Sequence, residues 1–194
     1  MKNFRPFICI LFLIPFFLGC EELEELLEEE FEETITFDGV LEIVEKTPVS
    51  DIDDDITVTT QIGGYRISSD PDIASLIEDD NAEITNIKIN EIRYSFTDFV
   101  GNEEAVVESI TFLVTSQDLT IKNSTFAANI FPSEADEQNI TYSHVDDFSA
   151  VEQAVVRNPN GALGFQFIGI LSANPVDFKV GIRVPVTVTI KAKI

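Results

Sequence analysis

The sequence is poor in the side chains on which most enzyme chemistry depends. Its 194 residues include no tryptophan, a single histidine, His144, and only two cysteines, Cys9 and Cys20. An acyl-transfer site needs a nucleophile, a base and an orienting group held together, and a zinc site needs several His or Cys ligands. With no G-x-S-x-G motif and no cysteine after residue 20, the sequence favours neither.

Positive charge is scarce as well. The chain has 12 Lys and Arg residues against 35 Asp and Glu residues, for a net charge of −23. Residues 1–19 contain Lys2, Arg5 and no acid, so the remaining chain carries 10 basic and 35 acidic side chains, or −25. Such a surface repels phosphate backbones, and we expect no nucleic-acid partner.

The first 19 residues have the layout of a signal peptide. Lys2 and Arg5 precede the apolar run FICILFLIPFFL, and the small residue Gly19 follows it. The run is shorter than the roughly 20 residues that a membrane-spanning helix requires, and Pro15 interrupts it. We therefore interpret residues 1–19 as an export signal.

The end of this segment, FLGC, resembles the lipobox of bacterial lipoproteins, with Phe17 and Leu18 in place of the commonest residues. In that family the cysteine thiol is joined to diacylglycerol, the chain is cut before the cysteine, and the new amino terminus is acylated. The resemblance implies lipid attachment at Cys20, with palmitate among the acyl chains. Two or more chains anchor a protein stably, because each buried methylene contributes about 0.8 kcal/mol. The alternative is an ordinary secretory signal that leaves Cys20 as a free thiol.

The lipobox is followed by EELEELLEEEFEE, thirteen residues of which nine are Glu. Leu23, Leu27 and Phe31 lie four apart, as on one stripe of a helix, but like charges oppose compaction. We expect residues 20–33 to form an acidic tether, either a frayed helix or an extended chain. Acidic residues after the lipidated cysteine also resemble the export signal of surface lipoproteins of Bacteroidota. The resemblance implies a surface-exposed position on the outer membrane, with its periplasmic face as the alternative.

Residues 34–194 are long enough for a single domain with a sizeable core. The clearest pattern is at the end, where every even position from 176 to 194 is apolar and the odd positions are mostly polar. This alternation predicts a strand with one buried face. Because such a strand would be about 60 Å long, we expect a bend or break between Gly181 and Pro185.

Shorter alternating segments precede this strand. In NIKINEIRYSF the apolar positions change parity across Asn90 and Glu91, which predicts a β-bulge. DFVGNEE reads as a hairpin turn into a strand over 106–115. Further strands are expected over 35–45, 56–62, 119–126, 140–143 and 163–171. Two short helices are expected, one capped by Asp70 and one stopped by Pro159.

These elements predict an all-β fold: an antiparallel β-sandwich, immunoglobulin-like, with one or two short helices. A small barrel is the competing architecture, because it shares the same alternation of inward and outward side chains.

Two groups of residues are candidate sites. Asp51, Asp53 and Asp55 form a carboxylate cluster suited to calcium, but Ile56 and Ile62 occupy the glycine and closing glutamate positions of an EF-hand. A solvated acidic loop explains this cluster better than a metal site. His144 is followed by Asp146 and Asp147 and is a candidate base or metal ligand, although a strand-end residue is the simpler interpretation.

No cofactor is expected. We therefore predict a non-enzymatic, lipid-anchored envelope protein that binds or scaffolds another envelope protein or a glycan. The alternatives are a glycan-binding surface lipoprotein and a hydrolase on the same scaffold. Glycan platforms are often built on aromatic faces, and this chain has only Tyr65, Tyr94 and Tyr142 besides its phenylalanines.

Overall fold

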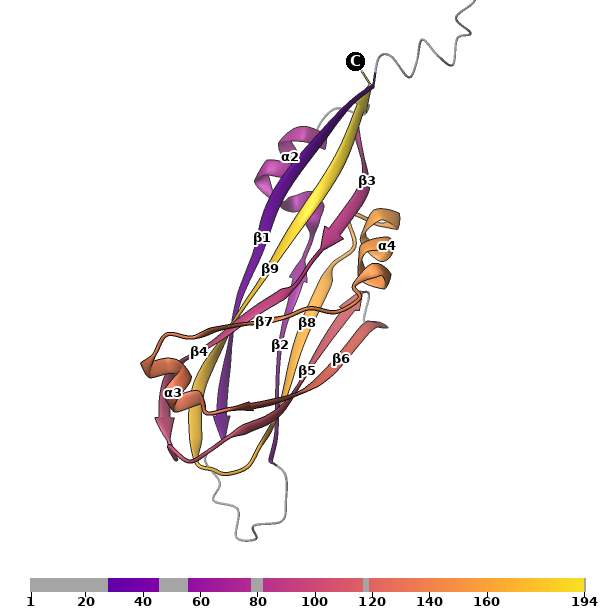
Figure 1. Cartoon of the computed structure of the whole chain (residues 1–194). Helices are drawn as coiled ribbons and strands as arrows, with labels where there is room; N and C mark the ends of the chain where they lie inside the picture. The colour runs from indigo at the N-terminus through magenta and orange to yellow at the C-terminus, as the bar shows by residue number, and fades with distance from the viewer. Residues whose placement is uncertain (1–27, 46–55, 78–81, 117–118, 194) are drawn as a thin grey trace, which may run out of the picture.

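The computed structural model describes residues 28–45, 56–77, 82–116 and 119–193. Nine strands within these ranges form two antiparallel sheets (Figure 1). The first sheet has the order β1-β9-β4-β7, with β3 also paired to β9: β1 (Glu28–Glu45), β9 (Val176–Lys193), β4 (Ile92–Gly101), β7 (Thr141–His144) and β3 (Ala82–Ile89). The second has the order β2-β8-β5-β6: β2 (Ile56–Tyr65), β8 (Leu163–Leu171), β5 (Val107–Ser116) and β6 (Leu119–Ile130).

The core lies between the two sheets and is formed mainly by the inward-facing side chains of both, with further side chains from the helices. Phe96 on β4 and Phe178 on β9 are fully buried in the first sheet, and Phe167 on β8 is fully buried in the second. Aromatic contacts cross the space between the sheets, as between Tyr94 and Phe112, whose ring centroids are 5.6 Å apart. Two hydrogen-bonded sheets packed on one core make the fold an antiparallel β-sandwich, the architecture that was predicted.

β9 organises the first sheet. It pairs with β1 along its whole length, from Val176 to Lys193, so of the predicted bend or break near Gly181 to Pro185 the break does not occur. On its other side β9 pairs first with β4, as far as Arg183, and then with β3, from Val186 onward. Pro185 therefore lies where the neighbour of β9 changes from β4 to β3, and β1 remains paired with β9 across this point. Pro185, which cannot donate a ladder hydrogen bond, pairs with Thr36 of β1 and has no register partner on β3 or β4.

The predicted bulge at Asn90 and Glu91 is confirmed. Ile89 pairs with Val186 and Arg93 pairs with Arg183. The chain therefore advances four residues from β3 to β4 while β9 advances only three. The extra residue restores the parity of the apolar positions. Apolar side chains before and after it consequently face the core: Ile87, Ile89, Ile92, Tyr94 and Phe96.

The acidic segment does not end where the sequence predicts. β1 begins at Glu28, so residues 28–33 belong to the first sheet rather than to a tether. Glu30 on β1 and Glu83 on β3 both lie directly opposite Lys191 of β9. Opposite charges in register stabilise a ladder, and this pairing overrides the helical preference of a glutamate-rich segment.

Within the described ranges, three short α-helices accompany the sheets, with a 3-10 turn at Ile67–Ser69. α2 (Pro71–Ile77) and α4 (Ser149–Arg157) are the two expected helices, and Asp70 caps α2 by accepting a hydrogen bond of 3.1 Å from the amide of Asp72. The third helix, α3 (Pro132–Glu137), was not predicted.

The predicted hairpin at DFVGNEE is wrong, because β4 and β5 belong to different sheets. The connection instead carries the chain across the sandwich beside the start of β9. The amide of Asn102 donates a hydrogen bond of 2.8 Å to the carbonyl of Pro175. A Cβ on Gly101 would lie 2.3 Å from the same oxygen, so the crossing requires glycine at this position.

Candidate functional site

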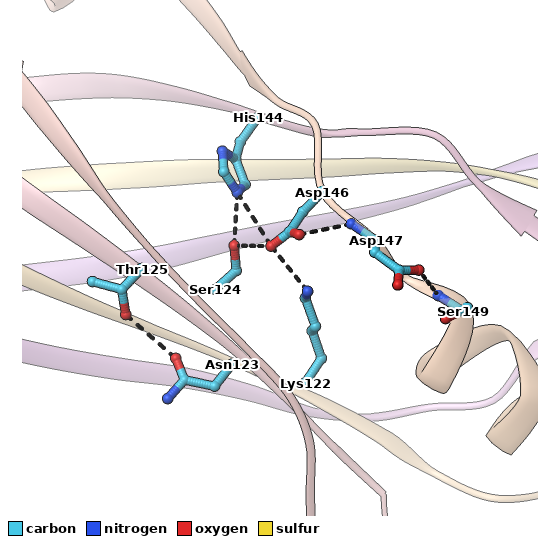
Figure 2. A network of polar contacts seen from close by, with 8 residues as sticks. All are labelled: Lys122, Asn123, Ser124, Thr125, His144, Asp146, Asp147 and Ser149. Atoms are coloured by element: carbon cyan, nitrogen blue, oxygen red, sulfur yellow. Dashed lines mark hydrogen bonds and ion pairs between the residues drawn. The ribbon is translucent and has the colours of Figure 1, made fainter.

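The candidate His144 belongs to a polar cluster of four side chains, Lys122, Ser124, His144 and Asp146, which we call the edge network (Figure 2). The hydroxyl of Ser124 lies 2.7 Å from Nε2 of His144 and also donates a hydrogen bond to Oδ2 of Asp146. The same carboxylate oxygen forms an ion pair with the ammonium group of Lys122, whose Nζ lies 2.9 Å away. Nε2 of His144 is 3.8 Å from Oδ2 of Asp146.

The edge network joins the two sheets at one side of the sandwich. Lys122 and Ser124 lie on β6, the last strand of the second sheet, and His144 ends β7, the last strand of the first. Asp146 follows β7, and its other oxygen accepts a hydrogen bond of 2.7 Å from the amide of Asp147. Asp147 in turn accepts a hydrogen bond of 3.0 Å from the amide of Ser149, where α4 begins.

The surroundings of this cluster favour a neutral histidine beside an ionised aspartate. Burial lowers the pKa of His144, and the nearby Asp146 carboxylate opposes that shift only in part. The imidazole also stacks on Phe126, with ring centroids 3.9 Å apart and an interplanar angle of 11°. The hydrogen bond from Ser124, followed by that from Lys122, holds the pKa of Asp146 well below its usual range.

The geometry of the edge network differs from that of a nucleophilic triad. In a triad the carboxylate contacts the ring nitrogen remote from the serine, whereas here Ser124 contacts both Nε2 of His144 and the carboxylate of Asp146. Ser124 is only 4% exposed, so its hydroxyl is largely shielded from solvent. The arrangement satisfies polar groups between two strand edges, which agrees with the simpler interpretation of His144.

The other predicted site residues, Cys20 and the cluster Asp51, Asp53 and Asp55, lie outside the described residues. Within the described ranges, no three His, Cys, Asp or Glu side chains are grouped so that they could hold a metal ion. Among the helices of the same ranges, none is long and apolar enough to cross a membrane.

A hollow of about 720 Å³ lies on the outer face of the first sheet, and we call it the sheet trough. Its floor follows a row of paired residues across four strands, from Val40 on β1 through Gly181 and Ser95 to Thr141 on β7. Gly181 presents no side chain in the middle of this row, and a Cβ there would lie 3.0 Å from the hydroxyl of Ser95. The trough is therefore a gap in the outward-facing layer of side chains.

Two arginines line the trough along the next row of residues. Arg93 on β4 pairs directly with Arg183 on β9, which pairs on its other side with Asp38 of β1, and both arginines belong to the lining. Oε1 of Glu91 engages Arg93, at 2.7 Å from Nε and 2.5 Å from the terminal nitrogen, while Oε2 of Glu91 accepts a hydrogen bond from Ser143. These hydrogen bonds lower the pKa of Glu91, so its carboxylate stays ionised.

A second hollow, of about 680 Å³, lies beside α3 and is acidic. Its lining includes five carboxylates and two phenylalanines: Glu103, Glu104, Glu134, Asp136, Glu137, Phe99 and Phe131. Asp136 has a structural role, because its carboxylate accepts a hydrogen bond of 2.8 Å from the amide of Phe99 and so attaches α3 to β4.

Sequence reasoning did not identify the lining of the sheet trough. Gly181 and Arg183 stand at outward positions of the final alternating strand, and Arg93 and Ser95 stand at outward positions of β4. What the sequence did not reveal is the register that places these four residues side by side. A glycine within an alternating strand was the available signal, since it marks either a bend or a close approach.

No protein-family model and no curated protein matches the chain. Solved structures similar to it include the infectious bursal disease virus Gx strain structure, at 11% identity and a TM-score of 0.34 over 85% of this chain. The chain spans 37% of that structure's chain. The decameric BFDV capsid protein matches at 7% identity and a TM-score of 0.40, over 86% of this chain and 100% of that one. Likenesses at these scores carry no conclusion about function.

Proposed function

We propose that the chain is a lipid-anchored protein of the bacterial outer membrane that binds or scaffolds other envelope components and does not catalyse a reaction. The observation that carries this proposal is the order of features at the start of the chain: a basic segment, an apolar run too short to span a bilayer, and FLGC. Acylation at Cys20 would hold the protein at the bilayer, because two or more acyl chains anchor a protein stably.

The start of the first strand supports a short connection between anchor and domain. Seven residues, 21–27, separate Cys20 from the beginning of β1 at Glu28. Seven residues span at most about 25 Å even when fully extended. The end of the sandwich where β1 begins would therefore lie near the headgroups, with the opposite end pointing away from the bilayer.

The edge network supports the non-catalytic part of the proposal. Its serine is buried, and its aspartate is engaged by Lys122 and Ser124 rather than by the distal nitrogen of the histidine. Four polar side chains that satisfy one another stabilise a cross-sheet contact and leave no activated nucleophile.

Mass spectrometry of the mature amino terminus tests the anchor directly. We expect the terminal peptide to begin at Cys20 and to carry diacylglycerol and an amide-linked acyl chain. The matched control is Cys20→Ser, which should lose the lipid and leave the membrane fraction. A mature protein that starts elsewhere, or that carries an unmodified Cys20, would overturn the proposal.

Protease treatment of intact cells then separates the two faces of the outer membrane. A surface-exposed domain is degraded while a periplasmic marker protein survives, and this is the result we expect. Protection of the domain until the outer membrane is permeabilised would place it on the periplasmic face.

A further inference from the structure

The first strand, β1, is the longest free edge in the described part of the sandwich. Among the described residues, β9 is its single ladder partner, so no strand pairs with the other side of β1 (Figure 1). β1 pairs with β9 over 18 residues without a register shift, and it contains no proline. A long, regular edge presents unpaired amide and carbonyl groups to which another extended chain can bind.

The other edges of the described sheets carry features that hinder the addition of a strand. β7 has only four residues, and the register of β2 with β8 shifts between Ile62 and Tyr65. α4 packs against β3, where Glu152 accepts a hydrogen bond of 2.8 Å from the amide of Ile89. β6 is joined to the other sheet by the edge network, and its register with β5 shifts twice. Short strands, bulges and covering elements are usual protections of an edge, and β1 is neither short nor bulged.

The charge of β1 decides which chains can pair with it. Its 18 residues include eight acidic residues and no basic residue. Four of the eight lie opposite a basic residue of β9 in the ladder: Glu28, Glu30, Asp38 and Glu42. The two strands together still contain nine acidic and four basic residues, for a net charge of −5. The bases of β9 therefore offset the acidity of this edge only in part.

A second copy of the chain is a poor match for this edge through its own β1. Two such strands side by side would bring together eight acidic residues from each and no basic residue, and like charges directly opposite each other are destabilising. A basic chain is favoured at the same positions, because Glu30, Glu32 and Glu42 are exposed on the outward face of β1. Val40 lies on that face as well and is 67% exposed.

We propose that the free edge of β1 binds an extended, basic segment of a partner protein, which joins the first sheet as a further strand. Lysine or arginine side chains of this segment lie beside Glu30, Glu32 and Glu42, and an apolar side chain covers Val40. This assignment names the kind of partner for the binding role proposed above and rests on that role, although it does not depend on the lipid anchor.

A glycan matches this edge less well than a peptide does. The unpaired amide and carbonyl groups of an edge strand alternate at the spacing of a second backbone. The acidic composition of β1 also repels anionic glycans and nucleic acids. A basic peptide segment satisfies both the backbone groups and the charge.

Calorimetric titration of the full-length lipidated protein in detergent tests the proposal. The probe is a short peptide in which lysine alternates with valine. One control peptide has all its central amides N-methylated, which keeps the charge but removes the backbone donors, and a second has glutamate in place of lysine. We expect each control to bind at least about tenfold more weakly than the probe, because one lost charge-assisted or backbone hydrogen bond has about that effect.

Three results of this titration would overturn the proposal. Failure of the lysine peptide to bind would remove the partner class. Equal binding of the N-methylated peptide would show that charge alone holds the probe and that no strand is added. Equal binding of the glutamate peptide would show that the partner need not be basic.

Amide hydrogen exchange, measured residue by residue by NMR, locates the peptide on the protein. Amides of an edge strand that point away from its single neighbour lack ladder protection, so an added strand should protect alternate residues of β1. We expect this alternation between Glu28 and Glu45 and no change along β6. Protection along β2 or β6 instead would contradict β1 as the site. Protection of β1 that rises with protein concentration in the absence of peptide would show that a second copy occupies the edge, and would overturn the partner assignment.

Variants test the charge of the edge. Thr34→Lys combined with Thr36→Lys places two bases on exposed positions of β1 and should weaken binding of the lysine peptide by at least about fivefold. The matched control is Thr120→Lys combined with Thr125→Lys, which adds the same charge at exposed positions of β6. No loss in the first pair, or an equal loss in the second, would contradict β1 as the site. Circular dichroism of each variant confirms that the sheets are intact.

The two proposals fail in different ways. If the amino terminus is unmodified but the lysine peptide binds along β1, the anchor is wrong and the partner class stands. If Cys20 is acylated and the lysine peptide does not bind, the partner class is wrong and the anchor stands.

Discussion

Ser124 is the residue on which the edge network depends, because its hydroxyl is shared by His144 and Asp146. Ser124 lies on β6, whereas His144 is the last residue of β7 and Asp146 comes just after it. The hydroxyl therefore contacts residues of the other sheet, with which β6 forms no ladder. A buried polar atom that loses such partners retains its desolvation cost. Ser124→Ala removes the hydroxyl and leaves the imidazole and carboxylate without it.

We expect Ser124→Ala to lower the free energy of unfolding by about 1–2 kcal/mol. Thr125→Ala is the matched control: Thr125 is the next residue on β6, is exposed, and forms a hydroxyl contact of 2.8 Å with Thr111 within one sheet. Its effect should be within about 0.5 kcal/mol, as for most surface substitutions. Denaturant titrations at neutral pH measure both, and equal losses in the two variants would show that the cross-sheet contact contributes nothing special.

His144 makes the stability of the protein dependent on pH in a defined direction. Burial lowers its pKa below the usual 6.5, so the unfolded chain takes up this proton at a higher pH than the folded chain does. Between the pKa of His144 in the folded chain and its pKa in the unfolded chain, the unfolded state binds more protons. The contribution of His144 to stability therefore falls as the pH drops below about 6.5. Asp146, whose pKa is also lowered, adds a further loss only below its usual value of 3.8.

Because His144 is the single histidine, its ring proton gives one resolved NMR signal, and we expect its titration midpoint to lie below 6.5. The difference in unfolding free energy between the native chain and His144→Gln should shrink as the pH falls from about 7 to about 5. Using a difference cancels the protonation of the many carboxylates common to both chains. A midpoint above 6.5 would show that the Asp146 carboxylate outweighs burial.

At the scale of elements, the alternation of side chains predicted strands well because it depends only on which face is buried. The bulge at Asn90 and Glu91 was visible for the same reason, since a change of parity must be corrected for both halves to face one core. The sequence did not show which strands pair with one another. Alternation marks the inner face of a strand but not the sheet to which it belongs, and so β4 and β5 were wrongly joined as a hairpin.

The remaining differences have the same physical origin in long-range pairing. The first strand gains a ladder with β9 that no local glutamate pattern reveals, and α3 has only six residues, less than two turns, which is too short to show a helical repeat of apolar positions. The edge network was anticipated only at His144 and its acidic neighbours, because Ser124 is twenty residues earlier on another sheet. Chemistry that crosses between sheets becomes visible only once the register is known.

The crossing from β4 to β5 gives a prediction at this scale. Gly101 has a φ of 141° and approaches the carbonyl of Pro175, whereas Gly64 has a φ of 89° and an added Cβ there would meet no atom within 4 Å. Gly101→Ala must therefore move the backbone of the neighbouring connection, while Gly64→Ala has only the conformational cost, about 1 kcal/mol.

Thermal or denaturant unfolding should show a clearly larger loss for Gly101→Ala than for Gly64→Ala, by about 1–3 kcal/mol, the usual cost of an overpacked site. A similar loss in both variants would mean that the connection between the sheets adapts without strain, and that the close approach to Pro175 is not what requires glycine there.

For the whole molecule, the long strands β1 and β9 separate the two ends of the sandwich. β1 and β9 each have 18 residues, about 60 Å at the usual rise. The start of β1 and the end of β9 lie at one end, and α3 lies toward the other (Figure 1). If Cys20 is acylated, the short connection to Glu28 brings the first end to the bilayer and directs the α3 end away from it.

Single labelled cysteines test this orientation, since the chain has no cysteine after residue 20 and a lipidated Cys20 does not react with thiol probes. Glu83→Cys places a fluorophore on exposed β3 near the start of β1, and Glu137→Cys places one on exposed α3; each removes one negative charge. In vesicles containing a headgroup quencher, we expect strong quenching at residue 83 and weak quenching at residue 137, because quenching of this kind acts only near the bilayer. Equal quenching at both positions would contradict this orientation and mean that the sandwich lies flat on the membrane.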